Sequence, residues 1–385
     1  MISGQPIFDA HLDLAYLAEL GRDLTQPLDD LDESADPHAP AAVTLPELTA
    51  ANVHRCLGTI FTEASANPDG KYAKVSYPPG DATAAYFKGI NQLNRYHTWE
   101  RDGCIQFFPP PLPPGERDSS RSEQGEGRTA TVEHSRTKDR APNAADEPVS
   151  RTGESSGSSR PIQLGILIEC ADPSINPHDL SFWAARGVVA VGLTWVHQSR
   201  YAGGNATDTG LTDLGRELIN EMARLNIALD LSHLSQRSTM DALDFTNVRV
   251  CASHSNCRAL LGDRNTEGWQ RHIDDDTITT VCARGGVIGL NLYRGFIKLG
   301  LGEAERPTIS DAVNHIDHVC QIAGSAKHSG IGSDLDGGFG ATSLPQGIAR
   351  AAEVTKILEE LSRRNYTDAD IADIAFNNWS RFFGL

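Results

Sequence analysis

Short apolar segments of this sequence end repeatedly in side chains that can bind metal ions. Each of these side chains closes or directly follows a run rich in aliphatic residues; they are His11, Asp13, Glu169, His233, His254 and Asp334. Imidazole nitrogens and carboxylate oxygens are the ligands that zinc and similar ions accept. Their recurrence at the ends of five segments predicts one shared metal site.

Taken singly, these residues have simpler interpretations. His11 and Asp13, in His-Leu-Asp, could form a turn or a helix cap, and a buried arginine could neutralise Glu169. A lone histidine at a strand end is more often a hydrogen-bonded core residue. Asp336, two residues after Asp334, is best interpreted as the cap of a following helix. Only the combination favours metal ligation.

Three histidines and three carboxylates are enough ligands for two ions. One carboxylate can bridge a pair of zinc-like ions held about 3.5 to 4 Å apart, and such a pair can share a hydroxide and polarise the carbonyl group under attack. The residues therefore predict a binuclear hydrolase acting on amides or esters.

The segments that must position these ligands are short β-branched runs alternating with amphipathic stretches, which is typical of βα units. Eight parallel strands with crossover helices predict an α/β fold, a TIM-like (β/α)8 barrel with its chemistry at the carboxyl ends of the strands. An open doubly wound sheet is the alternative, but the glycine-rich turn that it favours is absent after the first strand. The strands are expected near residues 6–11, 55–61, 162–169, 187–195, 227–233, 248–254, 285–293 and 329–337.

Helices are expected between the strands, for example over 211–226 and 310–324, where apolar residues recur every three or four positions. His315 and His318 lie three apart on the second of these helices, with no acidic partner motif between them. A surface position is expected for both.

Composition narrows the class of protein. The chain has 385 residues, 39% of them apolar, and a formal charge of −17, which disfavours nucleic acid and anionic membranes as partners. Its seven scattered cysteines form no CxxC pair and are expected to be reduced thiols. Neither a signal sequence nor an apolar run of about 18 residues is found, so a cytoplasmic protein is expected.

Residues 109–160 differ abruptly from the rest, being rich in Pro, Ser, Gly, Glu and Arg. Such a segment buries too little apolar surface to offset its ordering entropy. We expect a disordered insertion between the second and third strands of a barrel that otherwise occupies residues 1–385 as one domain.

The motifs resemble those of the membrane (renal) dipeptidases, peptidase family M19 of the amidohydrolase-like barrels. The resemblance covers nearly the whole chain outside the insertion: FDAHLDL, ILIECAD, LDLSH, ASHSNCRAL, GSDLDGG and NNWSRFF. It implies two Zn2+ ions, with His11 and Asp13 on one, His233 and His254 on the other, and Glu169 bridging them.

The resemblance also implies the remaining roles. Arg264, in the Arg-Asn pair after ASHS, would bind the substrate carboxylate, and a guanidinium fork suits that task. Asp334 would be the catalytic aspartate that holds the bridging hydroxide and passes its proton to the leaving amine. A homodimer is expected from the resemblance alone.

Two departures from the family pattern stand out. Cys170 follows Glu169 where a glycine is usual. The family has a histidine almost directly after the Leu-Thr of the fourth strand, whereas this chain reads LTWVHQSRY. His197, two residues late, is the nearest candidate to bind the substrate and polarise its carbonyl.

The sequence therefore predicts a metallo-dipeptidase that hydrolyses L,L and possibly L,D dipeptides. One alternative is a binuclear hydrolase acting on a cyclic amide, a lactone or an N-acyl amino acid. The other is a binding protein stabilised by metal and without turnover, although an intact Asp334 argues against a purely structural site.

Overall fold

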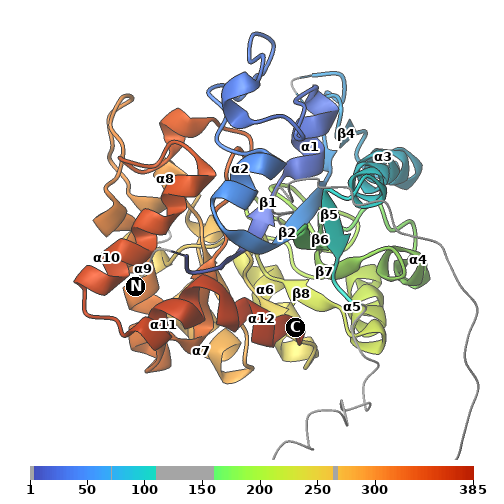
Figure 1. The fold of residues 1–385 in the computed structure, drawn as a ribbon. Helices are drawn as coiled ribbons and strands as arrows, with labels where there is room; N and C mark the ends of the chain where they lie inside the picture. Colours follow the sequence, from blue (N-terminus) through green and yellow to red (C-terminus); the bar gives the residue numbers. More distant parts are fainter. Residues whose placement is uncertain (1–3, 71, 110–159, 263–267) are drawn as a thin grey trace, which may run out of the picture.

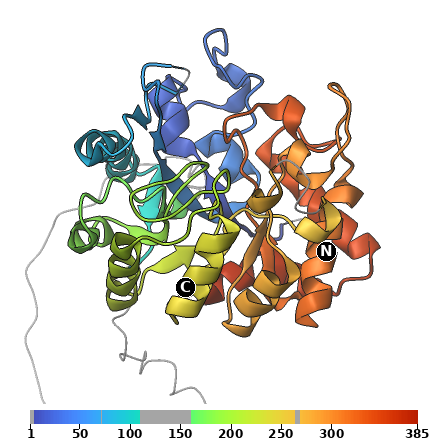
Figure 2. The ribbon, with the colours of Figure 1, turned by 180° about the vertical axis from the view of Figure 1, so that it is seen from behind.

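The computed structural model describes residues 4–70, 72–109, 160–262 and 268–385. Its centre is a ring of parallel strands with helices around it, and the chain colours run round that ring in order (Figures 1 and 2). The expected insertion lies, apart from its two end residues, outside the described residues.

Eight parallel strands form the barrel, in the order β10-β11-β1-β2-β6-β7-β8-β9. A parallel bridge between Ala252, just after β9, and Ile288 in β10 joins the two ends of this order. The predicted (β/α)8 fold is confirmed, and each expected strand segment overlaps one barrel strand. The strands are β1 Ile7–Leu12, β2 Val53–Phe61, β6 Ile162–Glu169, β7 Val188–Gly192, β8 Ala228–Asp230, β9 Val250–Cys251, β10 Ile288–Leu290 and β11 Ser329–Ile331.

Three further strands were not expected. β5 (Ile105–Phe107) pairs with the first half of β6, whereas β7 pairs with β6 only from Ile166 onward. The two strands thus share one edge of β6. β3 (Glu63–Ala64) and β4 (Ser76–Tyr77) form a separate parallel pair. The predicted barrel strands overlap longer apolar, β-branched runs, whereas β3 and β4 do not, and so no pattern in the sequence revealed them.

The helices begin and end at residues suited to those positions. The two helices expected from the sequence are confirmed: α5 begins after Thr212, whose side chain accepts the N–H of Gly215, and α9 begins with a capping box between Thr308 and Asp311. The α-helices are α1 Leu14–Leu20, α2 Leu45–Ala50, α3 Ala82–Arg101, α4 Leu180–Ala184, α5 Asp213–Leu225, α6 Gln236–Phe245, α7 Asp275–Ala283, α8 Arg294–Ile297, α9 Ile309–Ala323, α10 Thr355–Arg363, α11 Asp368–Ala372 and α12 Asn378–Phe383.

Short helical turns complete the described ranges. A π-helical turn, Asp373–Asn377, separates α11 from α12. The 3-10 turns are Leu28–Asp30, Pro177–Asp179, Arg258–Leu260, Trp269–Arg271, Ala326–His328, Ala341–Ser343 and Ala351–Val354. Within the described ranges, no helix is both long and apolar enough to cross a lipid bilayer.

The expectation of a surface position for His315 is wrong. Its side chain is buried on α9, where Nδ1 accepts the backbone N–H of Cys257 at 3.1 Å and Nε2 lies 3.0 Å from the carbonyl oxygen of Ile297. Helical spacing alone could not predict this position, because the two partners lie in other parts of the chain.

Candidate metal centre and active site

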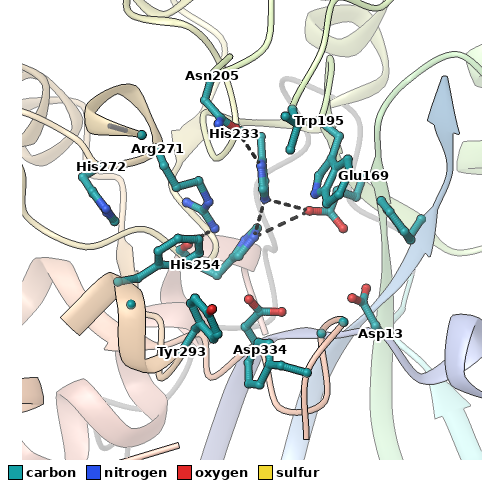
Figure 3. Close-up of a pocket in the computed structure, with 18 of the residues that line it drawn as sticks. Asp13, Glu169, Trp195, Asn205, His233, His254, Arg271, His272, Tyr293 and Asp334 are labelled. Atoms are coloured by element: carbon teal, nitrogen blue, oxygen red, sulfur yellow. Dashed lines mark hydrogen bonds and ion pairs between the residues drawn. The ribbon is translucent and has the colours of Figure 1, made fainter. Parts of the chain in front are cut away.

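The carboxyl ends of five barrel strands bring the six predicted ligands together. All six side chains are buried. All of them except His11 line a cavity of about 330 Å³ (Figure 3). Two groups of three have ligand atoms within 4.8 Å of one another: His11, Glu169 and His254, and His11, Asp13 and Asp334. The strand ends supply these side chains because parallel strands of a barrel end at the same rim.

Glu169 lies between two sets of ligand atoms. Its Oε2 is 3.6 Å from His11 Nε2, whereas its Oε1 is 3.2 Å from His233 Nε2 and 3.6 Å from His254 Nε2. The two histidine nitrogens of the second set are 3.0 Å apart. One carboxylate therefore presents a different oxygen to each set, the arrangement that a bridging ligand needs.

Asp13 and Asp334 complete the set around His11. His11 Nε2 is 3.8 Å from Asp13 Oδ1 and 4.0 Å from Asp334 Oδ1. The Thr59 hydroxyl donates to Asp13 Oδ1, and the Asn291 amide donates to Asp334 Oδ2 at 2.8 Å. Asp334 Oδ1 is thus the oxygen that faces the other ligands.

Neighbouring side chains orient the imidazole rings. The Ser253 hydroxyl donates to Asp230 Oδ2 at 2.5 Å, so it can only accept from the rings beside it: His254 Nδ1 at 2.8 Å and His11 Nδ1 at 3.3 Å. His233 Nδ1 lies 3.0 Å from Asn205 Oδ1. With Nδ1–H donated in this way, each Nε2 keeps its lone pair for a metal ion.

Backbone conformation at the strand ends is unusual. His233, Asp334 and Cys170 have φ values of 68°, 58° and 72°. Non-glycine residues adopt this left-handed region at a cost of about 1 kcal/mol, and such residues cluster at functional sites. Cys170 stands where the resemblance implies a glycine, and glycine adopts this φ without strain. A glycine is also needed at position 337, because a Cβ there would overlap Asp334 Oδ1.

Burial dominates the electrostatics of the ligand cluster. It raises the pKa of Glu169 to about 8, of Asp334 to about 8 and of Asp13 to about 6, and it lowers the pKa of His233 and His254 well below the usual range. Among the described residues, no lysine or arginine forms an ion pair with Glu169. Buried carboxylates of this kind need a positive charge, and neutral imidazoles beside them are ready to bind a cation.

Arg271 is the functional residue that the sequence interpretation missed. It is buried in the pocket lining, with Nη2 donating to the His254 carbonyl at 2.8 Å and Nη1 donating to Ser255 Oγ at 3.2 Å. Its Nε has no hydrogen-bond partner within the described ranges. The available signal was an arginine at the end of the loop before α7. The role expected for Arg264, earlier in the same loop, stays a prediction. Arg264 lies outside the described residues.

His197 does not reach the main pocket. It is exposed and lines a small separate pocket with Glu63 and Cys170. Thr194 Oγ1 donates to the His197 carbonyl at 2.5 Å, which turns the loop after β7 tightly. As a result Trp195, and not His197, lines the metal pocket.

Asp336 does not cap a following helix as expected. It is buried, accepts the backbone N–H groups of Ala42 at 2.8 Å and Val43 at 3.1 Å, and pairs with Arg22. It ties the loop that carries Asp334 to the segment before α2, a contact between distant parts of the chain.

Comparisons with known proteins match the chain to one family. The family model described as membrane dipeptidase (peptidase family M19) matches residues 162–384. Two uncharacterized dipeptidases of Schizosaccharomyces pombe are 38% and 31% identical over 172 and 175 residues, which are 44% and 46% of this chain. The matched stretches span only 38% and 40% of those relatives.

Solved structures share the whole fold. Dipeptidase AC, a metallopeptidase of family M19, superposes with a TM-score of 0.69 at 20% identity, covering 98% of this chain and 97% of its own. A Rhodobacter sphaeroides metallopeptidase liganded with a phosphinate mimic of L-Ala-D-Ala gives 0.70 at 20% identity, covering 98% of both chains. The probable dipeptidase PvdM of Pseudomonas aeruginosa gives 0.70 at 18% identity, covering 100% and 96%.

Proposed function

Because the chain belongs to the membrane dipeptidase family, peptidase family M19, we propose that it is a zinc-dependent dipeptidase that hydrolyses the amide bond of L,L and L,D dipeptides. The observation that carries this proposal is the position of Glu169, whose two oxygens face separate ligand sets at the edge of a pocket that also contains Arg271. The first feature suits two ions, and the second suits a substrate with a free carboxylate.

The donor set fits two divalent cations. His11, Asp13 and one oxygen of Glu169 would hold one ion, and His233, His254 and the other oxygen would hold the second. Nitrogen and carboxylate donors of this kind suit zinc. Bound zinc ions would polarise the scissile carbonyl and lower the pKa of the attacking water.

Arg271 would bind the substrate's terminal carboxylate. Its two Nη atoms are held by His254 and Ser255, which fixes the guanidinium while leaving Nε available within the described ranges. A fixed guanidinium binds a carboxylate with strong, directional hydrogen bonds. Because this anchor lies next to His254, the peptide bond that reaches the ligand cluster is the one nearest the carboxylate, as in a dipeptide.

Asp334 would carry the proton from the attacking water to the leaving amine. Asn291 occupies Oδ2, so Oδ1 is the atom available to accept a proton and return it to the leaving amine. Burial raises the pKa of Asp334 to about 8 when no cation is bound. A carboxyl with a raised pKa is better suited to accept a proton than an ordinary aspartate.

The test is metal analysis coupled to a substrate screen. We expect about two zinc ions per chain and hydrolysis of a panel of L,L and L,D dipeptides, with little activity towards tripeptides, lactones or N-acyl amino acids. Two bound ions without cleavage of any dipeptide would refute the proposed activity.

A further inference from the structure

The pocket has two groups of aromatic side chains, separated by the metal ligands. The first wall consists of Tyr16, Phe61, Tyr72 and Trp195. Its rings form one surface, with centroids 4.9 Å apart for Phe61 and Trp195, 5.5 Å for Tyr16 and Phe61, and 6.5 Å for Tyr16 and Tyr72.

The second wall consists of Tyr293, Phe296 and Phe339 and lies beside Arg271. Tyr293 is 4.9 Å from Phe296 and 4.8 Å from Phe339 between ring centroids, and the guanidinium carbon of Arg271 is 4.8 Å from the Phe296 ring. Figure 3 shows Arg271 on one side of His233 and Trp195 on the other.

This arrangement sets which residue of a bound dipeptide faces which aromatic wall. With its carboxylate on Arg271, the second residue lies against the second wall and the scissile carbonyl reaches the ligand cluster. The first residue must then continue past the ligands, where its side chain meets the first wall.

Among the described residues, the first wall presents aromatic rings and no charged side chain. The charged side chains in the described pocket lining are the three ligand carboxylates and Arg271, and none of them belongs to this wall. The Tyr16 hydroxyl is 2.9 Å from His38 Nε2, which satisfies it. A charged first side chain would therefore lose water without meeting an opposite charge in this wall, whereas an aromatic one would pack on aromatic rings.

We propose that the first wall makes this enzyme select dipeptides whose first residue carries an aromatic or large aliphatic side chain and reject those whose first residue is charged. This inference rests on the proposed dipeptidase function, because Arg271 must hold the carboxylate for the first residue to reach this wall.

The test compares substrates that share their second residue. In the zinc-loaded full chain, kcat/KM for Phe-Ala should exceed that for Gly-Ala by roughly 10- to 100-fold, since the ring is removed from water. Lys-Ala and Glu-Ala should not exceed Gly-Ala. If dipeptides are hydrolysed and Phe-Ala and Gly-Ala differ by less than about threefold, corresponding to under 1 kcal/mol, the selectivity is refuted.

Binding of phosphinate analogues separates this inference from the proposed function. The analogue of Phe-Ala should bind at least about tenfold more tightly than that of Gly-Ala, as measured by calorimetry, whether or not the enzyme turns over. Preference in binding without cleavage of any dipeptide would refute the activity but support the selectivity. Equal binding would refute the selectivity.

Two matched variants locate the effect. Trp195→Ala should lower the Phe-Ala to Gly-Ala ratio of kcat/KM by about tenfold. Trp195 also contacts His233, but any resulting loss of metal affects both substrates equally and cancels in this ratio. Phe339→Ala removes an aromatic ring from the second wall and should leave that ratio within about twofold while lowering the Ala-Phe to Ala-Gly ratio. A Trp195→Ala ratio equal to that of the wild type would place the selectivity elsewhere and overturn the assignment.

Discussion

At the scale of single residues, Ser253 has more influence on the metal centre than its size suggests. Its hydroxyl carries one proton, which goes to Asp230, so both His254 and His11 must donate their Nδ1–H to it. One side chain thus fixes the tautomer of a ligand in each of the two proposed zinc sites. Such outer contacts typically change metal affinity by 10- to 100-fold.

Ser253→Ala should therefore weaken zinc binding by about 10- to 100-fold, measured by titrating metal-free protein in a calorimeter. Ser333→Ala is the matched control. Ser333 is equally buried and also donates to an aspartate, Asp9, but no hydrogen bond from it to a histidine is found within the described residues. Equal losses of zinc affinity in both variants would refute the role of Ser253.

Arg271 makes a second prediction at this scale. Arg271→Met should lower kcat/KM for a dipeptide by roughly 30- to 1000-fold, mainly through KM, because a buried charged hydrogen bond contributes about 2 to 4 kcal/mol. The amide of the same dipeptide, which lacks the carboxylate, should be a poor substrate for both proteins and lose little further. An equal loss on acid and amide would mean that Arg271 supports the fold and does not bind the carboxylate.

At the scale of elements, α9 is fastened to the barrel by His315. The imidazole of His315 accepts the backbone N–H of Cys257 through Nδ1. Protonation of Nδ1 would therefore place its new N–H against the Cys257 N–H. Burial is the main cause that lowers the pKa of His315 to about 4. Because the unfolded chain binds this proton more readily, the contribution of His315 to stability is present above its ordinary pKa of 6.5 and is lost as the pH falls towards 4.

Replacing His315 should reduce the loss of unfolding free energy as the pH falls from 7 to 4. Between pH 7 and pH 4, the free energy of unfolding should fall by up to about 3 kcal/mol more in the wild type than in His315→Gln, measured by urea unfolding of metal-free protein. Glutamine can keep an acceptor and a donor but does not titrate. His318→Gln, on the same helix, should follow the wild type; identical curves for all three proteins would show that His315 does not control acid stability.

At the scale of the whole molecule, the sequence predicted the barrel because every strand carries its own pattern. The ligands at the strand ends could be predicted for the same reason, since the (β/α)8 fold brings strand ends together whatever their separation in the chain. The loops were less predictable. Trp195 lines the pocket in place of His197 because of a tight turn, and the role of Arg271 depends on contacts with His254 and Ser255. Such contacts leave no periodic signal in the sequence.

The closed ring of strands should also make the stability of the whole molecule depend on bound metal. Five strands each contribute ligands, so metal-free protein holds Glu169, Asp13 and Asp334 together at the rim. Burial raises the pKa of Glu169 and Asp334 to about 8. The folded state therefore binds protons more tightly than the unfolded chain, and the contribution of these protonated groups is lost as the pH rises from about 4 to 8.

Zinc should therefore stabilise the protein more at pH 8 than at pH 6. At pH 6 zinc must displace protons from the buried carboxylates, whereas by pH 8 the folded state has lost most of these protons. At one fixed zinc concentration, about 100 times the dissociation constant at pH 8, we expect roughly 2.7 kcal/mol of stabilisation at pH 8, or about 3 °C in Tm, and a smaller shift at pH 6, with chelation reversing both. Differential scanning fluorimetry at both pH values measures this shift. His254→Ala should reduce it at either pH, and a zinc-induced shift that is equal at pH 6 and pH 8 would show that the buried carboxylates do not govern the stability of the metal-free barrel.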